Sequence, residues 1–189
     1  MNSIRIFIVL LMVLAATASW WLNKHPDRLS SRPQPSTEHY ADFFLRNFSI
    51  HQFNSDGSKQ RLLQGSHLEH YPNDDSTQVR IAHIKLQTPA QATWIIDAQR
   101  AHLSRNGEQI VLNDNVVMQR LAFKQLEALK LETQTLHLDS IENRAKSDQA
   151  VQLSSENGLW NAIGMTAELN ENKLTLLSQV KGHHAVPTP

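Results

Sequence analysis

The amino-acid sequence predicts one N-terminal transmembrane helix followed by an all-β fold in which antiparallel strands stack into layers. Apolar side chains occupy every second position in many short runs, and turn-forming residues separate these runs. The whole pattern recurs about every 31 to 35 residues. Such recurrence is typical of units that bury their apolar faces against one another.

The predicted helix is the uncharged segment 6–22, IFIVLLMVLAATASWWL. At about 1.5 Å per residue it would be roughly 25 Å long, near the lower limit for a bilayer core of about 30 Å. Ala16 and Ala18 form a small-x-small cleavage pattern, so a removed signal peptide is the alternative. Trp20 and Trp21 favour a retained anchor, because they would lie at the membrane interface.

The segments around this helix complete the predicted organisation. Residues 1–5 would form a short cytoplasmic tail. Residues 23–39 contain three prolines and almost no apolar side chains, which predicts an extended tether. The folded domain would span residues 40–184, and residues 185–189 would form a disordered tail.

The domain begins with a predicted hairpin. Its first strand would place Phe44, Phe48 and Ile50 on one face. The segment Asn54-Ser55-Asp56-Gly57 predicts the turn, and a returning strand would run from about residue 59 to 68.

Two further segments follow different patterns. Val79 and Ile81 alternate along a strand that Pro89 would end, because proline cannot donate to a strand ladder. The segment 121–132 fits a strand and a short helix equally well.

The repeated units share a change of face within a strand. Because side chains alternate along a strand, such a change requires a bulge or a bend. The apolar positions before and after the change are Trp94, Ile96 and Ala98, then Ala101 and Leu103; Leu129, Leu131 and Thr133, then Leu136 and Leu138; Trp160, Ala162 and Gly164, then Ala167 and Leu169.

Each unit continues through a polar turn into another strand. The predicted stack therefore has an unpaired edge at each end. The second strands carry Ile110, Leu112 and Val116; Ala145, Ser147 and Val151; Leu174, Leu176 and Val180.

Composition and motifs argue against several function classes. Lys plus Arg and Asp plus Glu both number 18, so no basic field favours nucleic acid. Cysteine is absent, which excludes disulfides and thiol chemistry. The sequence has no G-x-S-x-G, P-loop or H-E-x-x-H motif, and Asp97, Asp114 and Glu168 lie in contexts that expose them. We therefore predict a protein that is not an enzyme.

The ten histidines do not predict a metal site. His67 and His70 are three residues apart, a spacing that places them on opposite faces of a strand. His183 and His184 are adjacent near the C-terminus. Solvated histidines explain this pattern better than metal ligands, and no cofactor is expected.

The order of these elements resembles the LptC family, bitopic lipopolysaccharide export proteins of Gram-negative bacteria. The most specific part is T-W-x-[IV]-x-A-x-x-A-x-L at residues 93–103, and SSENGLWNAIGMTAELNENKLTL at 154–176 fits the family's C-terminal strands. Relatives tend to carry a glycine where this chain has Asn113-Asp114-Asn115. Asparagine also tolerates left-handed backbone, so a turn is still expected there.

The resemblance implies a twisted β-jellyroll of the OstA/LptA-like type, open along one side, whose apolar interior takes the acyl chains of lipopolysaccharide. Related proteins receive the lipid from an inner-membrane ABC transporter, with membrane subunits LptF and LptG and ATPase LptB, and pass it to the periplasmic protein LptA. The chain would then be a single-pass inner-membrane protein with its C-terminal domain in the periplasm. A structural adaptor that joins the transporter to LptA without carrying lipid is the alternative.

Candidate site residues follow from the apolar pattern and the resemblance. Gly158 matches a family glycine linked to assembly with the periplasmic partner, although a bend or bulge would also explain a glycine there. Partner-binding candidates are Phe44, Phe48 and Ile50 at the N-terminal edge and Gly158, Leu174, Leu176 and Val180 at the C-terminal edge. Candidates for the groove that binds lipid, each of which could equally be plain core, are Ile81, Trp94, Ile96, Leu103, Ile110, Leu112, Val116, Met118, Leu131, Leu138, Val151, Leu153, Leu169 and Leu176.

Overall fold

A computed structural model gives the structure of the chain and describes Thr17, Trp20, residues 40–88 and residues 92–184. Thr17 and Trp20 are helical. The rest of the predicted span, the tail 1–5, the tether 23–39 and the tail 185–189 lie outside the described residues. Within the described part of the chain, no helix is both long and apolar enough to cross a bilayer.

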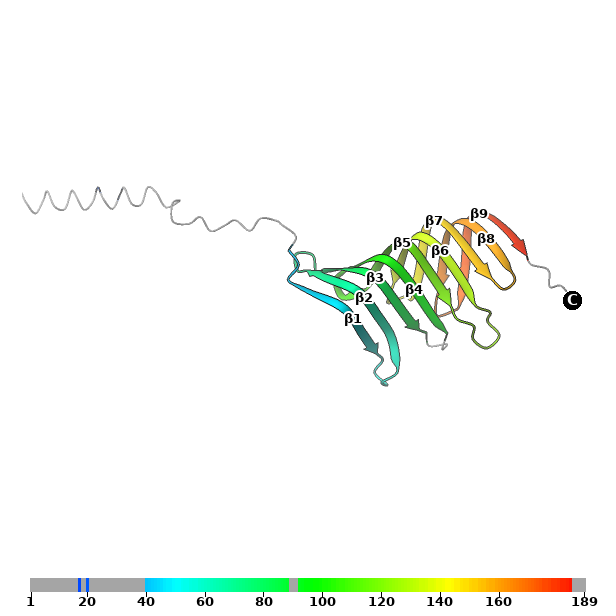
Figure 1. Cartoon of the computed structure of the whole chain (residues 1–189), viewed down its shortest axis with the longest axis horizontal. Helices are drawn as coiled ribbons and strands as arrows, with labels where there is room; N and C mark the ends of the chain where they lie inside the picture. The colour runs from blue at the N-terminus through cyan, green and yellow to red at the C-terminus, as the bar shows by residue number, and fades with distance from the viewer. Residues whose placement is uncertain (1–16, 18–19, 21–39, 89–91, 185–189) are drawn as a thin grey trace, which may run out of the picture. The chain divides into compact units, whose positions relative to one another are not determined.

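Across residues 40–88 and 92–184, nine antiparallel strands form one sheet, which confirms the all-β prediction (Figure 1). The strands pair in chain order, so the sheet is open: β1 pairs only with β2, and β9 only with β8. A short 3₁₀ helix at Arg105–Gly107 joins β4 to β5. The strands are β1 (Phe43–Phe53), β2 (Lys59–Tyr71), β3 (Ser76–Gln87), β4 (Thr93–Leu103), β5 (Gln109–Arg120), β6 (Leu129–Asp139), β7 (Arg144–Ser155), β8 (Gly158–Glu168) and β9 (Lys173–His184).

Most strands change face near their middle, as the repeats predicted. The pairing register shifts between Asp97 and Arg100 on β4 and between Thr133 and His137 on β6. In the third repeat it shifts between Asn161 and Ile163. Backbone in the left-handed region accompanies these changes, at Asn47, Ile81, Asp114, Asn115, Gly164 and Gln179.

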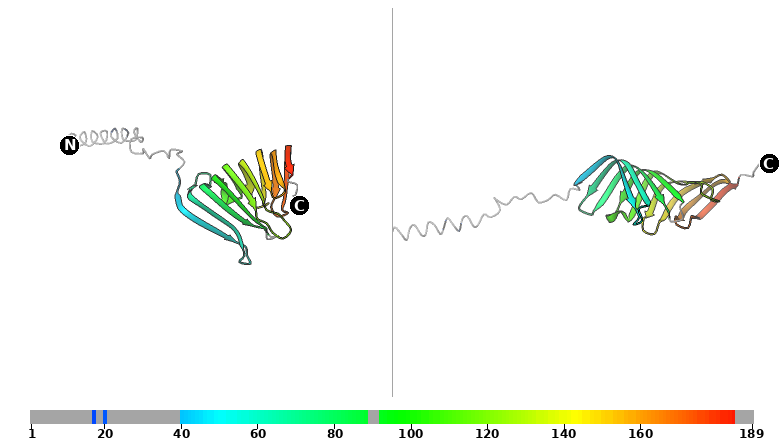
Figure 2. Two further views of the ribbon diagram at one scale, coloured as in Figure 1. Left: turned by 45° about the vertical axis from the view of Figure 1, so that its right-hand side comes forward. Right: turned by 90° about the horizontal axis from the view of Figure 1, so that it is seen from below.

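The bend folds the sheet so that its two long edges meet. In an antiparallel sheet of this order, the β1–β2 and β5–β6 turns lie on one long edge, and the β6–β7 and β8–β9 turns lie on the other. Arg61 Nη2 nevertheless donates to the carbonyl of Ser140 at 3.2 Å, and Arg120 Nη1 donates to the carbonyl of Asn172 at 3.0 Å. We call this junction, bridged by Arg61 and Arg120, the seam. Figure 2 shows the sheet curving from β1 to β9.

The core lies between the two folded halves. It is almost wholly apolar, and each large side chain buried there stabilises the fold by about 1.5–3 kcal/mol. The largest fully buried side chains are Trp94, Ile84, Ile96, Ile110, Leu112, Met118, Leu131, Leu136, Leu138, Met165, Leu169 and Val79.

The structure settles two local expectations. The segment 121–128 holds a tight turn closed by a bridge between Phe123 and Leu126, and β6 begins at Leu129, so no helix forms there. Asp114 and Asn115 are left-handed, as expected, but they form a bulge inside β5 and not a turn between strands.

The prediction that Phe44 shares a face with Phe48 and Ile50 is wrong. Phe44 lies opposite Glu69, whereas Leu45 lies opposite the buried Leu68. Asn47, whose backbone is left-handed, changes the face of the strand between Leu45 and Phe48.

Candidate lipid-binding interior and docking edges

Rows of inward-facing residues cross the sheet from one edge to the other. The strand register aligns one row on the half nearer the β1–β2 turn and another on the half nearer the β2–β3 turn. Since neighbouring strands are about 4.8 Å apart, each row is on the order of 40 Å long. The first row is Ile50, Leu63, Ile84, Ile96, Met118, Leu131, Leu153, Trp160 and Gly182. The second is Phe43, His70, Thr77, Leu103, Ile110, Leu138, Ala145, Ala167 and Leu174.

The structure places most predicted groove residues in this interior. Leu103, Leu153 and Leu176 are half-buried and pack against the core. The fully buried members are Trp94, Ile96, Ile110, Leu112, Val116, Met118, Leu131, Leu138, Val151 and Leu169.

Ile81 is the exception, and its predicted place in the interior is wrong. Its side chain is 61% exposed, and its φ of 52° makes it the point at which β3 changes face. The alternation that begins at Val79 therefore resumes at Ala82 and Ile84. A two-residue pattern cannot identify the residue at which the face changes.

Both edge strands expose apolar side chains. On β1, Phe44 is 60% exposed and Phe53 is 52% exposed. On β9, Leu177 is 58% exposed and Val180 is 51% exposed. An edge strand also presents unpaired backbone N–H and C=O groups, so each end of the sheet offers a template for another strand.

Gly158 lies at the start of β8, where β9 approaches closely. A Cβ at this position would be 2.4 Å from the carbonyl oxygen of His183. Gly182 has a related role, because its Cβ would be 2.2 Å from Trp160 Cδ1. The two glycines therefore allow the last part of β9 to pair with β8.

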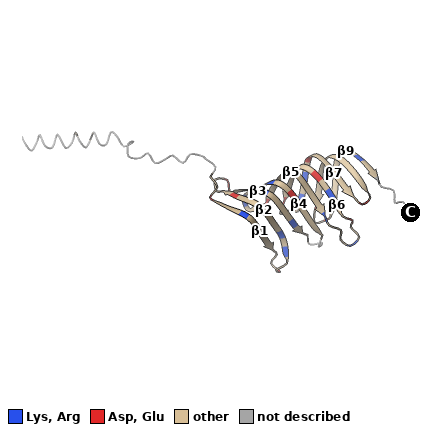
Figure 3. Ribbon diagram, viewed as in Figure 1, with Lys and Arg blue, Asp and Glu red and all other residues tan. Residues whose placement is uncertain are grey.

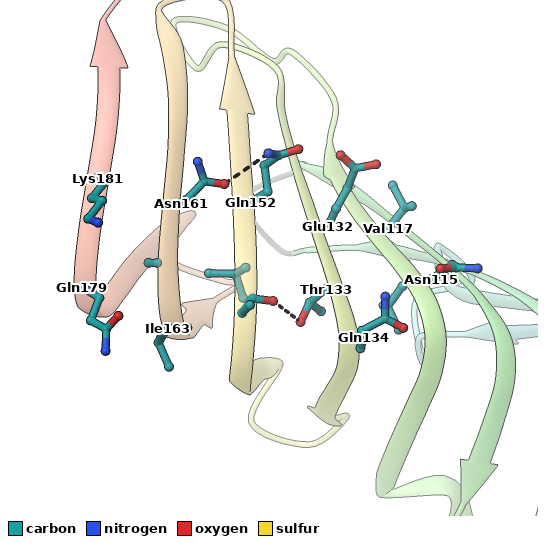
Figure 4. Close-up of a pocket in the computed structure, with 14 residues that line it drawn as sticks. Asn115, Val117, Glu132, Thr133, Gln134, Gln152, Asn161, Ile163, Gln179 and Lys181 are labelled. Carbon is teal, nitrogen blue, oxygen red and sulfur yellow. Dashed lines mark hydrogen bonds between the residues drawn. The ribbon is translucent and has the colours of Figure 1, made fainter.

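A cavity of about 490 Å³ crosses β5 to β9 near the bend (Figure 4). Two predicted groove residues, Val116 and Val151, contribute to its wall. The rest of the wall is mixed and includes amide side chains, the charged Glu132 and Lys181, and the apolar Ile163. Gln152 Nε2 donates to Asn161 Oδ1 at 3.1 Å across β7 and β8.

Charged residues are scattered over the strands (Figure 3). Arg100 pairs with Asp114 across β4 and β5, and Lys130 pairs with Glu132 within β6. The carboxylate of Asp114 accepts a hydrogen bond from Arg100, which lowers the pKa of Asp114.

Arg61 and Arg120 are inward-facing residues that the sequence reading missed. Strand register places both in one row with Leu86 and Trp94, next to the seam. Arg120 is 7% exposed, and its guanidinium carbon lies 5.8 Å from the centroid of Trp94. Burial lowers the pKa of both arginines. The sequence did indicate the inward position of Arg120, since Arg120 continues the two-residue alternation of Val116 and Met118.

His70 clamps β1 to the start of the sheet. Its Nδ1 lies 2.8 Å from Asp42 Oδ1, its Nε2 lies 3.0 Å from Asp75 Oδ1, and Phe43 stacks on its ring at 4.8 Å. The hydrogen bonds to Asp42 and then Asp75 raise the pKa of His70. Within the described residues, no group of three or more histidines and carboxylates has the geometry of a metal site.

Comparisons with known proteins agree with this architecture. A family model described as "Lipopolysaccharide-assembly, LptC-related" matches residues 8–185. A search of curated proteins found no match. The fold is similar to that of LptH from Pseudomonas aeruginosa, the LptA-homologous periplasmic component of a lipopolysaccharide transport device. The TM-score is 0.54 at 10% identity, and the match covers 68% of this chain and 95% of LptH. Because the family model covers nearly the whole sequence, the chain belongs to the LptC-related family of lipopolysaccharide-assembly proteins.

Proposed function

We propose that the domain binds the acyl chains of lipopolysaccharide in its apolar interior and passes the lipid along a protein bridge. The lipid would come from the inner-membrane ABC transporter, with LptF, LptG and LptB, and would go to LptA in the periplasm. The chain would be held in the inner membrane by the predicted span 6–22. Its role is transport, without a chemical reaction.

The observation that carries this proposal is the continuity of the inward-facing rows. Each row runs through all nine strands and ends at an exposed edge. Transfer of one methylene group from water to an apolar site is favourable by about 0.8 kcal/mol, so acyl chains would not cross water unaided. They could pass between two similar apolar interiors at little net free-energy cost.

The edges supply the alignment that such transfer requires. A partner strand added to β9 by β-augmentation would form ladder hydrogen bonds, and these would fix the register of the two sheets. The inward rows of this chain would then continue into the partner. We propose that β9 binds LptA, through the region of Gly158, Leu174, Leu176 and Val180, and that β1 contacts the transporter through Phe44, Phe48 and Ile50.

The closely packed core means that lipid uptake would require the seam to part. Ile96, Met118 and Leu131 are 0% exposed, so acyl chains could reach them only if the two halves of the sheet separate. The seam is the natural place for this movement, because the pairing of neighbouring strands stays intact when it opens.

A photo-crosslinking amino acid tests the proposal in cells. At Leu153, which faces the interior, we expect adducts with lipopolysaccharide that disappear when the transporter cannot hydrolyse ATP. Gln152 is the matched control, because it is the next residue and faces outward. Equal capture at both positions, or no capture at Leu153, Leu112 and Met118, would contradict lipid binding in the interior.

A structural adaptor is the second candidate, and the dense core is the observation that favours it. An adaptor would bind LptA without opening its interior. It predicts that Leu176→Asp abolishes LptA binding, while lipid adducts are absent at every interior position.

A further inference from the structure

Three basic side chains gather near the seam, at the ends of β2 and β3. Lys59 and Arg61 line a cavity of about 880 Å³, together with the β1–β2 turn, Leu86 and Asn143. A smaller cavity of about 110 Å³ is lined by Lys59, Arg61 and also Lys85. Lys59 and Arg61 line both cavities, whereas Lys85, which alternates with the inward-facing Ile84 and Leu86, lines only the smaller one at the same strand ends.

Among the described residues, these cations have no anionic partner. Across residues 40–88 and 92–184, no carboxylate forms an ion pair with Lys59, Arg61 or Lys85. Asp56 also lines the larger cavity, but its Oδ1 accepts hydrogen bonds from the Ser58 N–H at 2.9 Å and the Ser58 hydroxyl at 2.6 Å. The larger cavity therefore carries two cations, Lys59 and Arg61, for one carboxylate, and Lys85 adds a third cation at the smaller cavity beside it.

The guanidinium of Arg61 has unused hydrogen-bonding capacity. Its Nη2 donates to the Ser140 carbonyl, and its Nε is buried without a hydrogen-bond partner among the described residues. A buried donor without a partner destabilises a structure, and arginine remains charged even when burial lowers its pKa. This side chain can therefore bind an acceptor that the described residues do not supply.

We propose that this region binds a phosphate monoester on the saccharide headgroup of the transported lipid. The inference rests on the proposed lipid-binding function and adds the site of the headgroup. Arginine and lysine together are suited to phosphate, since arginine donates two N–H groups in one plane and lysine supplies a compact charge.

The position of Arg61 links headgroup binding to opening of the seam. When the seam parts, Arg61 loses the Ser140 carbonyl, and a phosphate replaces that acceptor and reaches Nε as well. The acyl chains then lie beside Leu86 and Trp94, which follow Arg61 in the same inward row. The headgroup stays in the cavity at the surface while the chains enter the interior.

Equilibrium binding to the full chain in detergent micelles at low salt tests the proposal. The probes are lipid A with its phosphates, the same lipid after enzymatic dephosphorylation, and inorganic pyrophosphate. We expect the phosphorylated lipid to bind at least about tenfold more tightly than the dephosphorylated lipid. The double substitution K59S/K85S should abolish this difference, and R61K should reduce it.

The control is K146S/K173S, which removes two exposed lysines elsewhere on β7 and β9. It should leave the preference for phosphate unchanged. If both lipids bind equally, or if the preference survives in K59S/K85S and R61K, the phosphate site is wrong although lipid binding stands.

If neither lipid binds, the proposed function fails, and pyrophosphate decides about the site. Binding of pyrophosphate that K59S/K85S abolishes would support a site for soluble phosphate. Absence of pyrophosphate binding would overturn the site as well.

Discussion

Ile81 shows how a single residue determines which side chains face the interior. It is β-branched and exposed, yet its backbone lies in the left-handed region, which L-residues other than glycine, asparagine and aspartate rarely adopt. Several other bends use asparagine or glycine at this conformation, at Asn47, Asn115 and Gly164, whereas β9 uses Gln179. The local strain at Ile81 therefore allows Val79, Ala82 and Ile84 on the same strand to face the interior.

This strain predicts a stabilising substitution. Ile81→Asn should increase the free energy of unfolding by about 1 kcal/mol, because asparagine tolerates left-handed backbone and little buried area is lost. Urea denaturation of the full chain measures the change. Ile141→Asn is the control, since Ile141 is 68% exposed and does not adopt a positive φ. An equal gain in both variants would contradict the strain.

His70 predicts a pH dependence at the N-terminal edge. Its pKa in the folded state is raised above the value in the unfolded chain, near 6.5, mainly by Asp42 and then by Asp75. Its contribution to stability is therefore complete below that value and is lost as the pH rises through the folded pKa. Asp42 has a lowered pKa, so its contribution is lost only in acid.

An NMR titration of the His70 ring tests this dependence. We expect a pKa above 6.5 in the parent chain and a lower value in Asp42→Asn. We also expect β1 amides to exchange faster at pH 8 than at pH 6 after correction for intrinsic rates. In His70→Gln that difference should vanish; if it persists, His70 does not hold β1.

At the scale of elements, the two edge strands differ in how they are secured. β1 is held by the His70 clamp and by Phe48, which packs against the core. β9 is held by Leu174 and Leu176 at one end and by the close approach to Gly158 and Gly182 at the other. The backbone of β9 thus depends on small residues at the edge where we propose that the partner strand adds.

Gly158→Ala tests this dependence. The new Cβ would clash with the His183 carbonyl oxygen, so the end of β9 must shift, and overpacking of this kind costs about 1–3 kcal/mol. We expect faster hydrogen exchange at residues 181–183 and weaker binding of LptA. Gly107→Asn is the control, because the nearest atom is 3.8 Å from its Cβ and asparagine tolerates the positive φ. If both variants behave like the parent chain, Gly158 is not needed for close approach.

At the scale of the whole molecule, opening of the seam distinguishes the two proposed functions. A lipid carrier must open the seam, whereas a structural adaptor need not. Arg61 and Ser140 are 79 residues apart in sequence, and their hydrogen bond joins opposite long edges of the sheet. Since the chain has no cysteine, the substitutions Arg61→Cys and Ser140→Cys introduce the only two thiols. A short bis-maleimide can then tie the seam closed.

The tied protein should bind LptA normally but lose lipid adducts at Leu153, because acyl chains would no longer reach the interior. Photo-crosslinking before and after the bis-maleimide reaction measures the loss. The double variant Gly107→Cys/Ser140→Cys provides a control, since Ser140 and Gly107 already contact one another on one long edge. Full lipid capture by the tied seam variant would show that lipid does not enter there.

The sequence by itself determined most of the strands and turns and the existence of a face change in each repeat, because these depend on residues two to five positions apart. The T-W-x-[IV]-x-A-x-x-A-x-L segment and the order of the strands also sufficed to indicate the family. Ten of the fourteen groove candidates are fully buried for the same reason, since alternation identifies the inward face wherever a strand is regular.

The tertiary structure alone decided where each face change falls and how the sheet closes. Ile81 and Phe44 were assigned to the wrong face because the residue that adopts left-handed backbone is selected by pairing with neighbouring strands. The bonds from Arg61 to Ser140 and from Arg120 to Asn172 span 79 and 52 residues, and the three cations near the seam come from two strands. These contacts depend on the accumulated curvature of nine strands, a property that no local pattern of side chains specifies.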